Sequence, residues 1–153
     1  MQPTDDDAPA RVEAVRQFNR FHTKYAETLD ARVPRSEFSL TEVRVLAEIA
    51  RGDARTAAAL ARELSLDTGY LSRILSGFEQ RQLISRRPSA TDARQSLLAL
   101  TEAGHARFAP LDAALNAGIR ASLDALTAAE QQQLIAAMQV IERLLGRTKR
   151  PPD

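Results

Sequence analysis

The feature that most constrains the fold is a pair of short, apolar-faced helical segments separated by a three-residue break. The first segment follows Thr56 and has apolar residues at helical spacing: Ala57, Leu60, Ala61 and Leu64. Ser65-Leu66-Asp67 interrupts the pattern, and Asp67 suits the N-cap of a second helix. That helix has apolar residues at i, i+3, i+4 and i+7: Leu71, Ile74, Leu75 and Phe78. Two short helices joined in this way predict a helix-turn-helix.

Longer helical patterns flank this pair on both sides. The stretch before it repeats apolar or aromatic residues in steps of three and four: Val15, Phe18, His22, Tyr25 and Leu29. Ser39 and Glu42 have the spacing of a capping box, which predicts the start of another helix. After the pair, Thr101 suits the cap of a long helix, and Thr127 and Glu130 repeat the capping-box spacing before a last one. The apolar positions of these two helices include Phe108, Leu111, Leu115, Ile119, Leu134, Met138 and Ile141.

The periodicity changes after Gln82. Residues 83–87 and 95–100 are predicted to be short extended segments, and the turn-rich stretch 88–93 between them indicates a β-hairpin. We therefore predict a mainly α-helical fold with a small β-hairpin wing, a winged helix-turn-helix flanked by dimerisation helices. Dimerisation is expected because the terminal helices carry more apolar surface than one small lobe can bury.

The outward side of the second helix has the chemistry of a DNA-reading surface. It carries short polar residues, one aromatic hydroxyl and one long cation: Thr68, Gly69, Tyr70, Ser72, Arg73 and Ser76. Short side chains let the helix approach base edges in the major groove, and Arg73 can reach a phosphate or a guanine. The hairpin adds Arg86, Arg87 and Arg94, and an arginine on a wing suits the narrow minor groove.

The charge distribution favours the same interpretation, although the whole 153-residue chain has a formal net charge of only +1. Five arginines oppose Glu79 and Asp92 between Arg73 and Arg94, which gives this stretch a local charge of +3. A cationic stretch beside a helix-turn-helix favours binding to phosphates. Aromatic residues make up 5% of the chain and Trp is absent, which argues against RNA modules that stack bases on aromatic sheets.

Several other kinds of protein are disfavoured by the sequence. Cysteine is absent, which excludes disulfides, thiolate zinc sites and cysteine redox switches. We see no nucleophile–base–acid constellation, glycine-rich phosphate loop or metal-ligand spacing, and we expect no enzyme activity, cofactor or metal. The chain has no apolar run long enough for a membrane span and no signal peptide at its start, so a cytoplasmic location is expected.

From Phe38 to Gly104 the sequence resembles the MarR family of bacterial transcriptional regulators. The matching segments include Leu71-Ser72-Arg73-Ile74-Leu75 and Leu83-Ile84-Ser85-Arg86. The most specific one is Asp92-Ala93-Arg94 followed by Leu100-Thr101-Glu102-Ala103-Gly104. With the flanking helices, the resemblance covers about residues 11–145. Gln82 departs from the pattern, because the family usually has a glycine there, where the backbone often takes a left-handed turn.

The resemblance implies a homodimeric DNA-binding regulator, which we expect to be a repressor, on a pseudo-palindromic operator in double-stranded DNA. It also implies release by a small-molecule effector, with Phe18, Phe21, His22, Tyr25 and Arg44 as candidate lining residues. For His22, a core or interface role is the competing interpretation. The expected organisation is a disordered acidic N-terminus (1–10), a dimerisation helix (11–35), a winged helix-turn-helix DNA-binding domain (36–100), C-terminal dimerisation helices (101–146) and a flexible tail (147–153).

An alternative function comes from a narrower resemblance. Four segments look like the MarR-type half of bacterial proteins that carry a C-terminal acetyltransferase: residues 15–21, 38–42, 67–75 and 94–96. In that case the chain is a regulatory or interaction module of an acetyltransferase-type protein, and the winged helix contacts protein rather than DNA. Binding to duplex DNA distinguishes the two hypotheses.

Overall fold

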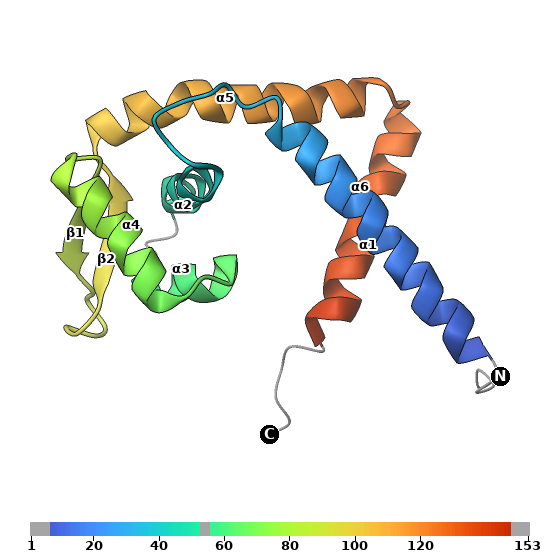
Figure 1. The fold of residues 1–153 in the computed structure, drawn as a ribbon, viewed down its shortest axis with the longest axis horizontal. Helices are drawn as coiled ribbons and strands as arrows, with labels where there is room; N and C mark the ends of the chain where they lie inside the picture. Colours follow the sequence, from blue (N-terminus) through green and yellow to red (C-terminus); the bar gives the residue numbers. More distant parts are fainter. Residues whose placement is uncertain (1–6, 53–55, 148–153) are drawn as a thin grey trace. The chain divides into compact units, whose positions relative to one another are not determined.

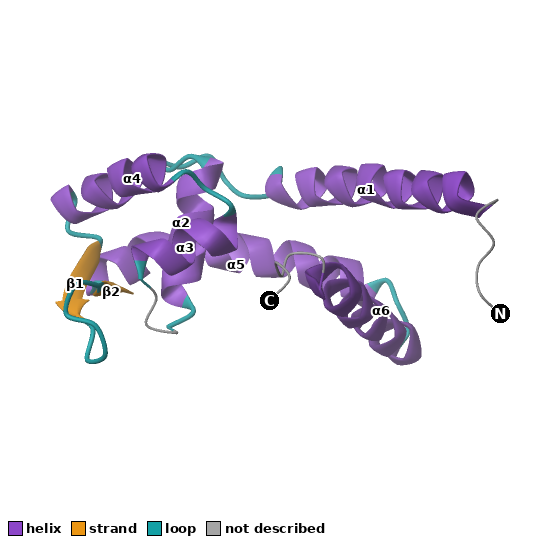
Figure 2. Ribbon diagram, turned by 90° about the horizontal axis from the view of Figure 1, so that it is seen from below, coloured by secondary structure: helices purple, strands orange, loops and turns teal. Residues whose placement is uncertain are grey.

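The computed structural model describes residues 7–52 and 56–147 (Figures 1 and 2). This part of the chain contains six helices and one two-stranded sheet, in the order predicted from the sequence. The elements are α1 (Ala8–Asp30), α2 (Leu40–Ala50), α3 (Ala57–Leu64), α4 (Thr68–Gln80), β1 (Ile84–Pro88), β2 (Ser96–Leu100), α5 (Glu102–Asp124) and α6 (Ala128–Gly146). Two compact units divide the chain after Leu115, within α5.

The helices begin where the sequence supplies capping side chains. Ser39 and Glu42 form the predicted capping box at the start of α2, and Thr127 and Glu130 form the second one at α6. Thr56 accepts a hydrogen bond from the Ala59 amide at the start of α3. Each cap satisfies a backbone amide that the helix itself leaves unpaired. The predicted helix starts at these positions are therefore confirmed.

The core of the first unit lies between α2, α3, α4, the hairpin and the first half of α5 (Figure 1). Its most completely buried side chains, all with less than 2% exposure, are Phe78, Leu46, Leu60, Leu71, Leu75, Leu83 and Val45. Burial of one such side chain contributes about 1.5–3 kcal/mol. Most apolar positions that predicted the helix-turn-helix are thus buried in this core, and Ala57 and Leu64 are partly buried against it.

The wing is an antiparallel pair of strands that runs from Ile84 opposite Leu100 to Pro88 opposite Ser96. Ile84, Leu98 and Leu100 are buried and attach the hairpin to the core, and β1 lies beside α4 (Figure 2). Both strands begin one residue later than the sequence predicted. The wing therefore has its base held in the core and its tip, residues 89–95, outside it.

Gln82 joins α4 to the wing in a left-handed conformation, with a φ of 58°. The Gln82 amide donates to the Glu79 carbonyl and the Leu83 amide to the Phe78 carbonyl, both at 2.9 Å, which is the Schellman pattern of helix ends. The same pattern ends α3 at Ser65, where φ is 53°. At position 82 this chain thus keeps the left-handed turn without a glycine and tolerates the associated strain.

Helices α1 and α6 contain no buried residue. Their exposed large apolar side chains are Val12, Val15, Phe18, Phe21, Ile135, Met138, Val140, Leu144 and Leu145. Helix α1 begins at Ala8, so residues 8–10 are helical and not part of a disordered N-terminus; Pro9 is compatible with the first helical turn. The rest of that predicted segment, residues 1–6, and the predicted tail at 148–153 lie outside the described residues. Among the described helices, none is long and apolar enough to cross a membrane.

Candidate nucleic-acid interface

Helix α4 separates its residues into a buried side and an exposed side. Its four inward residues, Leu71, Ile74, Leu75 and Phe78, are at most 9% exposed. All six residues predicted to read DNA are exposed: Thr68, Gly69, Tyr70, Ser72, Arg73 and Ser76. The structure therefore presents the predicted polar surface to solvent along most of the helix.

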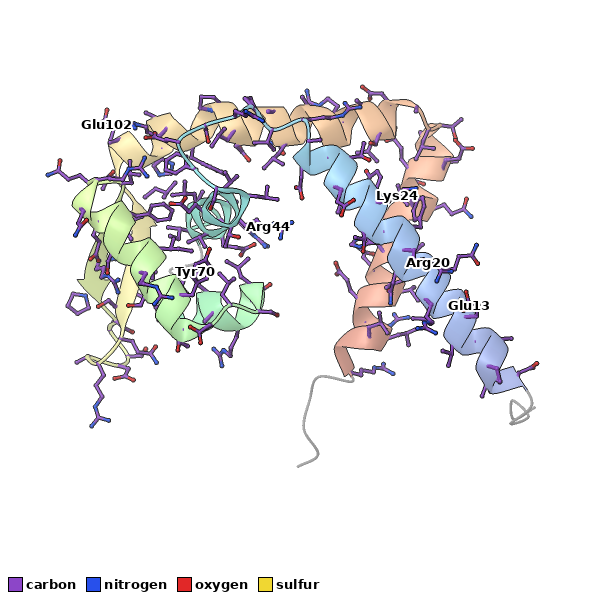
Figure 3. The ribbon with its side chains drawn as sticks, in the orientation of Figure 1. Glu13, Arg20, Lys24, Arg44, Tyr70 and Glu102 are labelled. Carbon is purple, nitrogen blue, oxygen red and sulfur yellow. The ribbon has the colours of Figure 1, made fainter. Side chains whose placement is uncertain are left out.

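The N-terminal end of α4 is fixed by Asp67, which accepts a hydrogen bond from the Tyr70 amide at 2.9 Å. Tyr70 itself, labelled in Figure 3, is 41% exposed. The amides at the start of a helix carry a partial positive charge that favours contact with phosphate, and at α4 the Asp67 carboxylate offsets part of this charge. A capped helix start with exposed hydroxyl groups can thus be positioned against a nucleic-acid backbone.

The tip of the wing has its own hydrogen bonds and presents Arg94. The Asp92 carboxylate accepts from the Arg94 amide at 3.0 Å, and the Gln95 amide donates to the Asp92 carbonyl at 3.0 Å. The Ser89 amide donates to the Gln95 carbonyl at 2.9 Å, which closes the loop. Arg87 and Arg94 are exposed. The backbone that carries Arg94 is therefore held in place, while its side chain is accessible.

Arg86 differs from its neighbour Arg87. Successive residues of a strand point to opposite faces, so the side chains of Arg86 and Arg87 leave the strand on opposite sides of the wing. The Arg86 Nε group pairs with the Glu79 carboxylate on α4. Arg86 thus links the base of the wing to α4, and its charge is partly neutralised within the protein.

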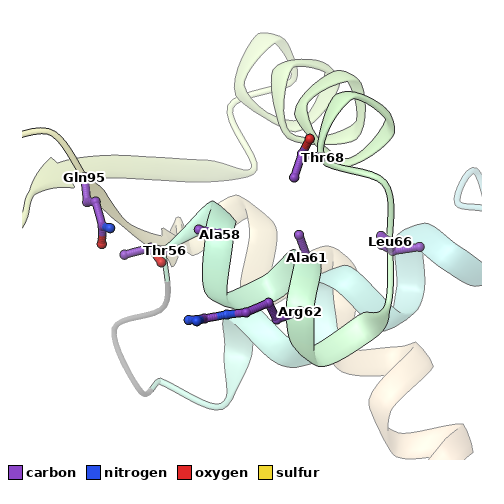
Figure 4. A pocket seen from close by; sticks show the side chains of 7 residues that line it. All are labelled: Thr56, Ala58, Ala61, Arg62, Leu66, Thr68 and Gln95. Atoms are coloured by element: carbon purple, nitrogen blue, oxygen red, sulfur yellow. The ribbon is translucent and has the colours of Figure 1, made fainter. Parts of the chain in front are cut away.

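A shallow hollow of about 400 Å³ lies between α3, the start of α4 and the hairpin (Figure 4). Its polar lining residues are Thr56 and Arg62, from the start and the outer side of α3, Thr68 of α4 and Gln95 of the hairpin. Sequence reasoning missed Arg62 and Gln95, because neither belongs to the apolar pattern or to the arginine cluster. Hydroxyl, amide and guanidinium donors in one place suit a phosphate oxygen.

The residues predicted to bind an effector lie in two groups. On α1, the rings of Phe18 and His22 stack with centroids 5.9 Å apart, and those of Phe21 and Tyr25 stack at 6.4 Å. Arg44, which is labelled in Figure 3, pairs with Asp30 at the end of α1, at 3.1 Å. Phe21 is 66% exposed, and none of the five residues lines the hollow described above. Binding of an effector by these residues stays a prediction.

A further cluster, which the sequence did not suggest, surrounds Glu37. Its carboxylate pairs with Arg81 at the end of α4 and with Arg107 on α5. The hydrogen bond from Arg107, together with the positive charges of both arginines, lowers the pKa of Glu37 below its ordinary value, and partial desolvation opposes this.

In the part of the chain that the structure describes, no group of His, Asp or Glu residues is arranged to hold a metal ion.

Taken together, these elements define a winged helix-turn-helix protein. Residues 36–95 match the MarR family, and the chain therefore carries a MarR family domain, as the resemblance implied. A comparison with curated proteins found no match.

Solved structures with the same fold include those of MarR, MepR and FabT. Wild-type MarR from E. coli, in its apo form, has a TM-score of 0.64 and 24% identity over 82% of this chain and 94% of its own. The MepR–DNA complex of S. aureus has a TM-score of 0.63 and 18% identity over 83% and 94%. FabT of Streptococcus pneumoniae in complex with DNA has a TM-score of 0.67 and 19% identity over 92% and 99%. At these identities the likeness establishes a shared fold.

Proposed function

We propose that this protein is a homodimeric transcriptional regulator that binds a pseudo-palindromic site in double-stranded DNA and has no catalytic activity. The observation that carries the proposal is the two-sided character of α4: its apolar side is buried, and its polar side from Thr68 to Ser76 is exposed throughout. The complexes of MepR and FabT with DNA support the proposal, because both proteins share the fold. The direction of regulation that we expect is repression.

In the proposed complex α4 enters the major groove and the wing contacts the adjacent minor groove. Arg73 contacts a base or a phosphate. The other exposed residues of this surface approach the DNA closely: Thr68, Gly69, Tyr70, Ser72 and Ser76. Arg87 and Arg94 extend from the wing. Arg86 is paired with Glu79, and Arg62 supplies an additional phosphate contact from α3.

The dimer follows from the exposed apolar side chains of α1 and α6, which water would otherwise solvate. A closed two-fold dimer presents two copies of α4, so its two half-sites lie about one helical turn apart, ~10 bp. Analytical ultracentrifugation tests this part: a species of twice the chain mass is expected, and a monomer at micromolar concentration contradicts it.

The decisive experiment selects bound duplexes from a random pool and then measures affinities by fluorescence anisotropy. Arg94→Ala is expected to weaken all duplexes similarly and to reduce the salt slope by about 1. Arg73→Ala is expected to cost about 1–3 kcal/mol on the selected site and to relax its sequence preference. Arg120→Ala, an exposed position on α5 outside the first unit, removes the same charge and serves as the control.

Two results would contradict the proposal. If no duplex is enriched and binding stays weak at low salt, the chain is better explained as an interaction module, such as the regulatory half of an acetyltransferase-type protein. If duplexes are enriched but Arg73→Ala and Arg94→Ala bind them like the wild type, the protein reads DNA with another surface.

A further inference from the structure

The Glu37 cluster connects three parts of the first unit that are distant in sequence. Glu37 precedes α2, Arg81 caps the C-terminal end of α4, and Arg107 lies on the first half of α5. One carboxylate oxygen contacts Arg81 and the other contacts Arg107. Two guanidinium groups therefore share one carboxylate, and each oxygen has a separate partner.

Arg81 is restrained on a second side by an aromatic ring. Its guanidinium carbon lies 4.7 Å from the centre of the Phe38 ring, a cation–π distance. Phe38 in turn meets Phe78 edge to face, with ring centres 6.0 Å apart at 81°. Because Phe78 is one of the inward residues of α4 and is fully buried, this stack ties Arg81 to the core.

The cluster lies at the opposite end of α4 from the residues proposed to meet DNA first. A helix rises ~1.5 Å per residue, so Thr68 is roughly 20 Å from Arg81 along the axis. A tilt of about 5° at the C-terminal end would displace the N-terminal end by roughly 1.7 Å. That displacement exceeds the range over which a hydrogen bond to a base edge is kept.

We propose that Glu37 is a positioning residue for sequence discrimination: by holding Arg81 and Arg107 on one carboxylate, it fixes the angle of α4 and so the alignment of its reading face. The proposal rests on the DNA-binding function proposed above. Glu37 need not touch DNA. Its loss would leave the two arginines without their common counter-charge and would let α4 occupy a range of angles, so the contacts to bases suffer while attraction to phosphates does not.

The test compares Glu37→Gln with the wild-type full-length protein on two duplexes of equal length. One is the selected site, and the other has the same base composition in scrambled order. Glu37→Gln removes one negative charge, and this alone would strengthen binding to both duplexes. The proposal predicts a different result: the ratio of the two affinities falls roughly fivefold to tenfold, and binding to the scrambled duplex is not weakened.

Asp112→Asn is the matched control, because it removes the same charge from an exposed position on α5. It is expected to leave the affinity ratio unchanged. Arg107→Gln is the second variant, since it breaks only one arm of the cluster, and it is expected to lower the ratio by a smaller factor. The double variant of Glu37 and Arg107 is expected to equal Glu37→Gln alone, because the two changes remove the same restraint.

The proposal is overturned if folded Glu37→Gln keeps the wild-type ratio, or if it loses affinity equally for both duplexes. Should Glu37→Gln fail to fold, Arg107→Gln decides by the same ratio. If the wild type discriminates between the duplexes and the variants do so equally well, only the role of Glu37 is refuted. If the wild type binds neither duplex, the proposed function itself is refuted.

Discussion

Replacing Gly104 or Gly77, two helical glycines of the first unit, by alanine is expected to change the free energy of unfolding in opposite directions. Gly104 lies in the first turn of α5 and is buried; a Cβ atom there would come within 2.1 Å of the Leu83 carbonyl oxygen. Gly77 lies in α4, and a Cβ atom there would meet nothing within 4 Å. Alanine at position 104 therefore tests the junction between wing and α5, and alanine at position 77 measures helix propensity alone.

The magnitude at position 104 follows from the contacts of Leu83. Its backbone would have to withdraw by about 1.3 Å, the difference between 2.1 Å and an ordinary contact of 3.4 Å. The Leu83 carbonyl accepts from the Thr101 amide at 2.9 Å, and the Thr101 hydroxyl donates to the Gln82 carbonyl at 2.7 Å. Loss of these bonds costs ~1 kcal/mol each, and repacking of the buried Leu83 side chain costs ~1–3 kcal/mol.

Helix propensity opposes this loss by at most ~1 kcal/mol, so Gly104→Ala is expected to lower the free energy of unfolding by about 2–4 kcal/mol. Gly77→Ala is expected to raise it by about 0.5–1 kcal/mol. Urea unfolding followed by far-ultraviolet circular dichroism, at one protein concentration, gives both values. If the Gly104→Ala midpoint matches or exceeds that of the wild type, the close approach of α5 to Leu83 is refuted.

Three further predictions concern polar groups. Ser39→Ala removes the capping box of α2 and is expected to cost about 1 kcal/mol in the same unfolding assay, whereas Ser39→Asp, which keeps a cap acceptor, costs less. The pKa of Glu37 is lowered in the folded protein, so its ionised carboxylate stabilises the wild type relative to Glu37→Gln. This stabilisation is complete above pH 4.5, the ordinary pKa, and is lost as the pH falls through the lowered pKa. The urea unfolding midpoints of the two proteins are therefore expected to converge at acid pH. Glu79→Gln frees Arg86 from its ion pair and is expected to tighten binding to every duplex and to steepen the salt slope, as measured by anisotropy.

Each of these expectations has a result that contradicts it. Equal unfolding midpoints for Ser39→Ala and the wild type would mean that other contacts already hold the start of α2. A constant difference between Glu37→Gln and the wild type down to acid pH would show that the carboxylate charge is not responsible. Weaker duplex binding by Glu79→Gln would show that the wing needs the Glu79–Arg86 pair more than it needs a free cation.

The parts of the fold that the sequence predicted are those governed by local rules. Apolar spacing located the helices, and the capping residues Ser39, Thr56, Asp67 and Thr127 located their starts, because each cap bonds to the amide three residues further on. The same spacing indicated which side of α4 is buried and which is exposed. The winged helix-turn-helix architecture was accordingly predicted correctly.

Features that depend on distant residues could not be predicted in this way. Glu37 and Arg107 are 70 positions apart, and no periodic pattern connects them. The pairing of Arg86 with Glu79 depends on the angle between wing and α4, which the hairpin sequence does not determine.

Two other features could have been treated better from the sequence. Neighbouring residues on a strand alternate sides, so the opposite directions of the Arg86 and Arg87 side chains could have been inferred. The early start of α1 at Ala8 was missed because the acidic residues before it suggested disorder.

The left-handed backbone at Gln82 limits which residues this position accepts as the sequence diverges. Glycine takes that conformation without steric penalty, and asparagine or aspartate takes it at a small one. Valine and isoleucine, with branched Cβ atoms, are strongly disfavoured there. Substitutions tolerated at position 82 are therefore expected to be few and mostly to small or amide side chains, although the side chain at this position is exposed to water.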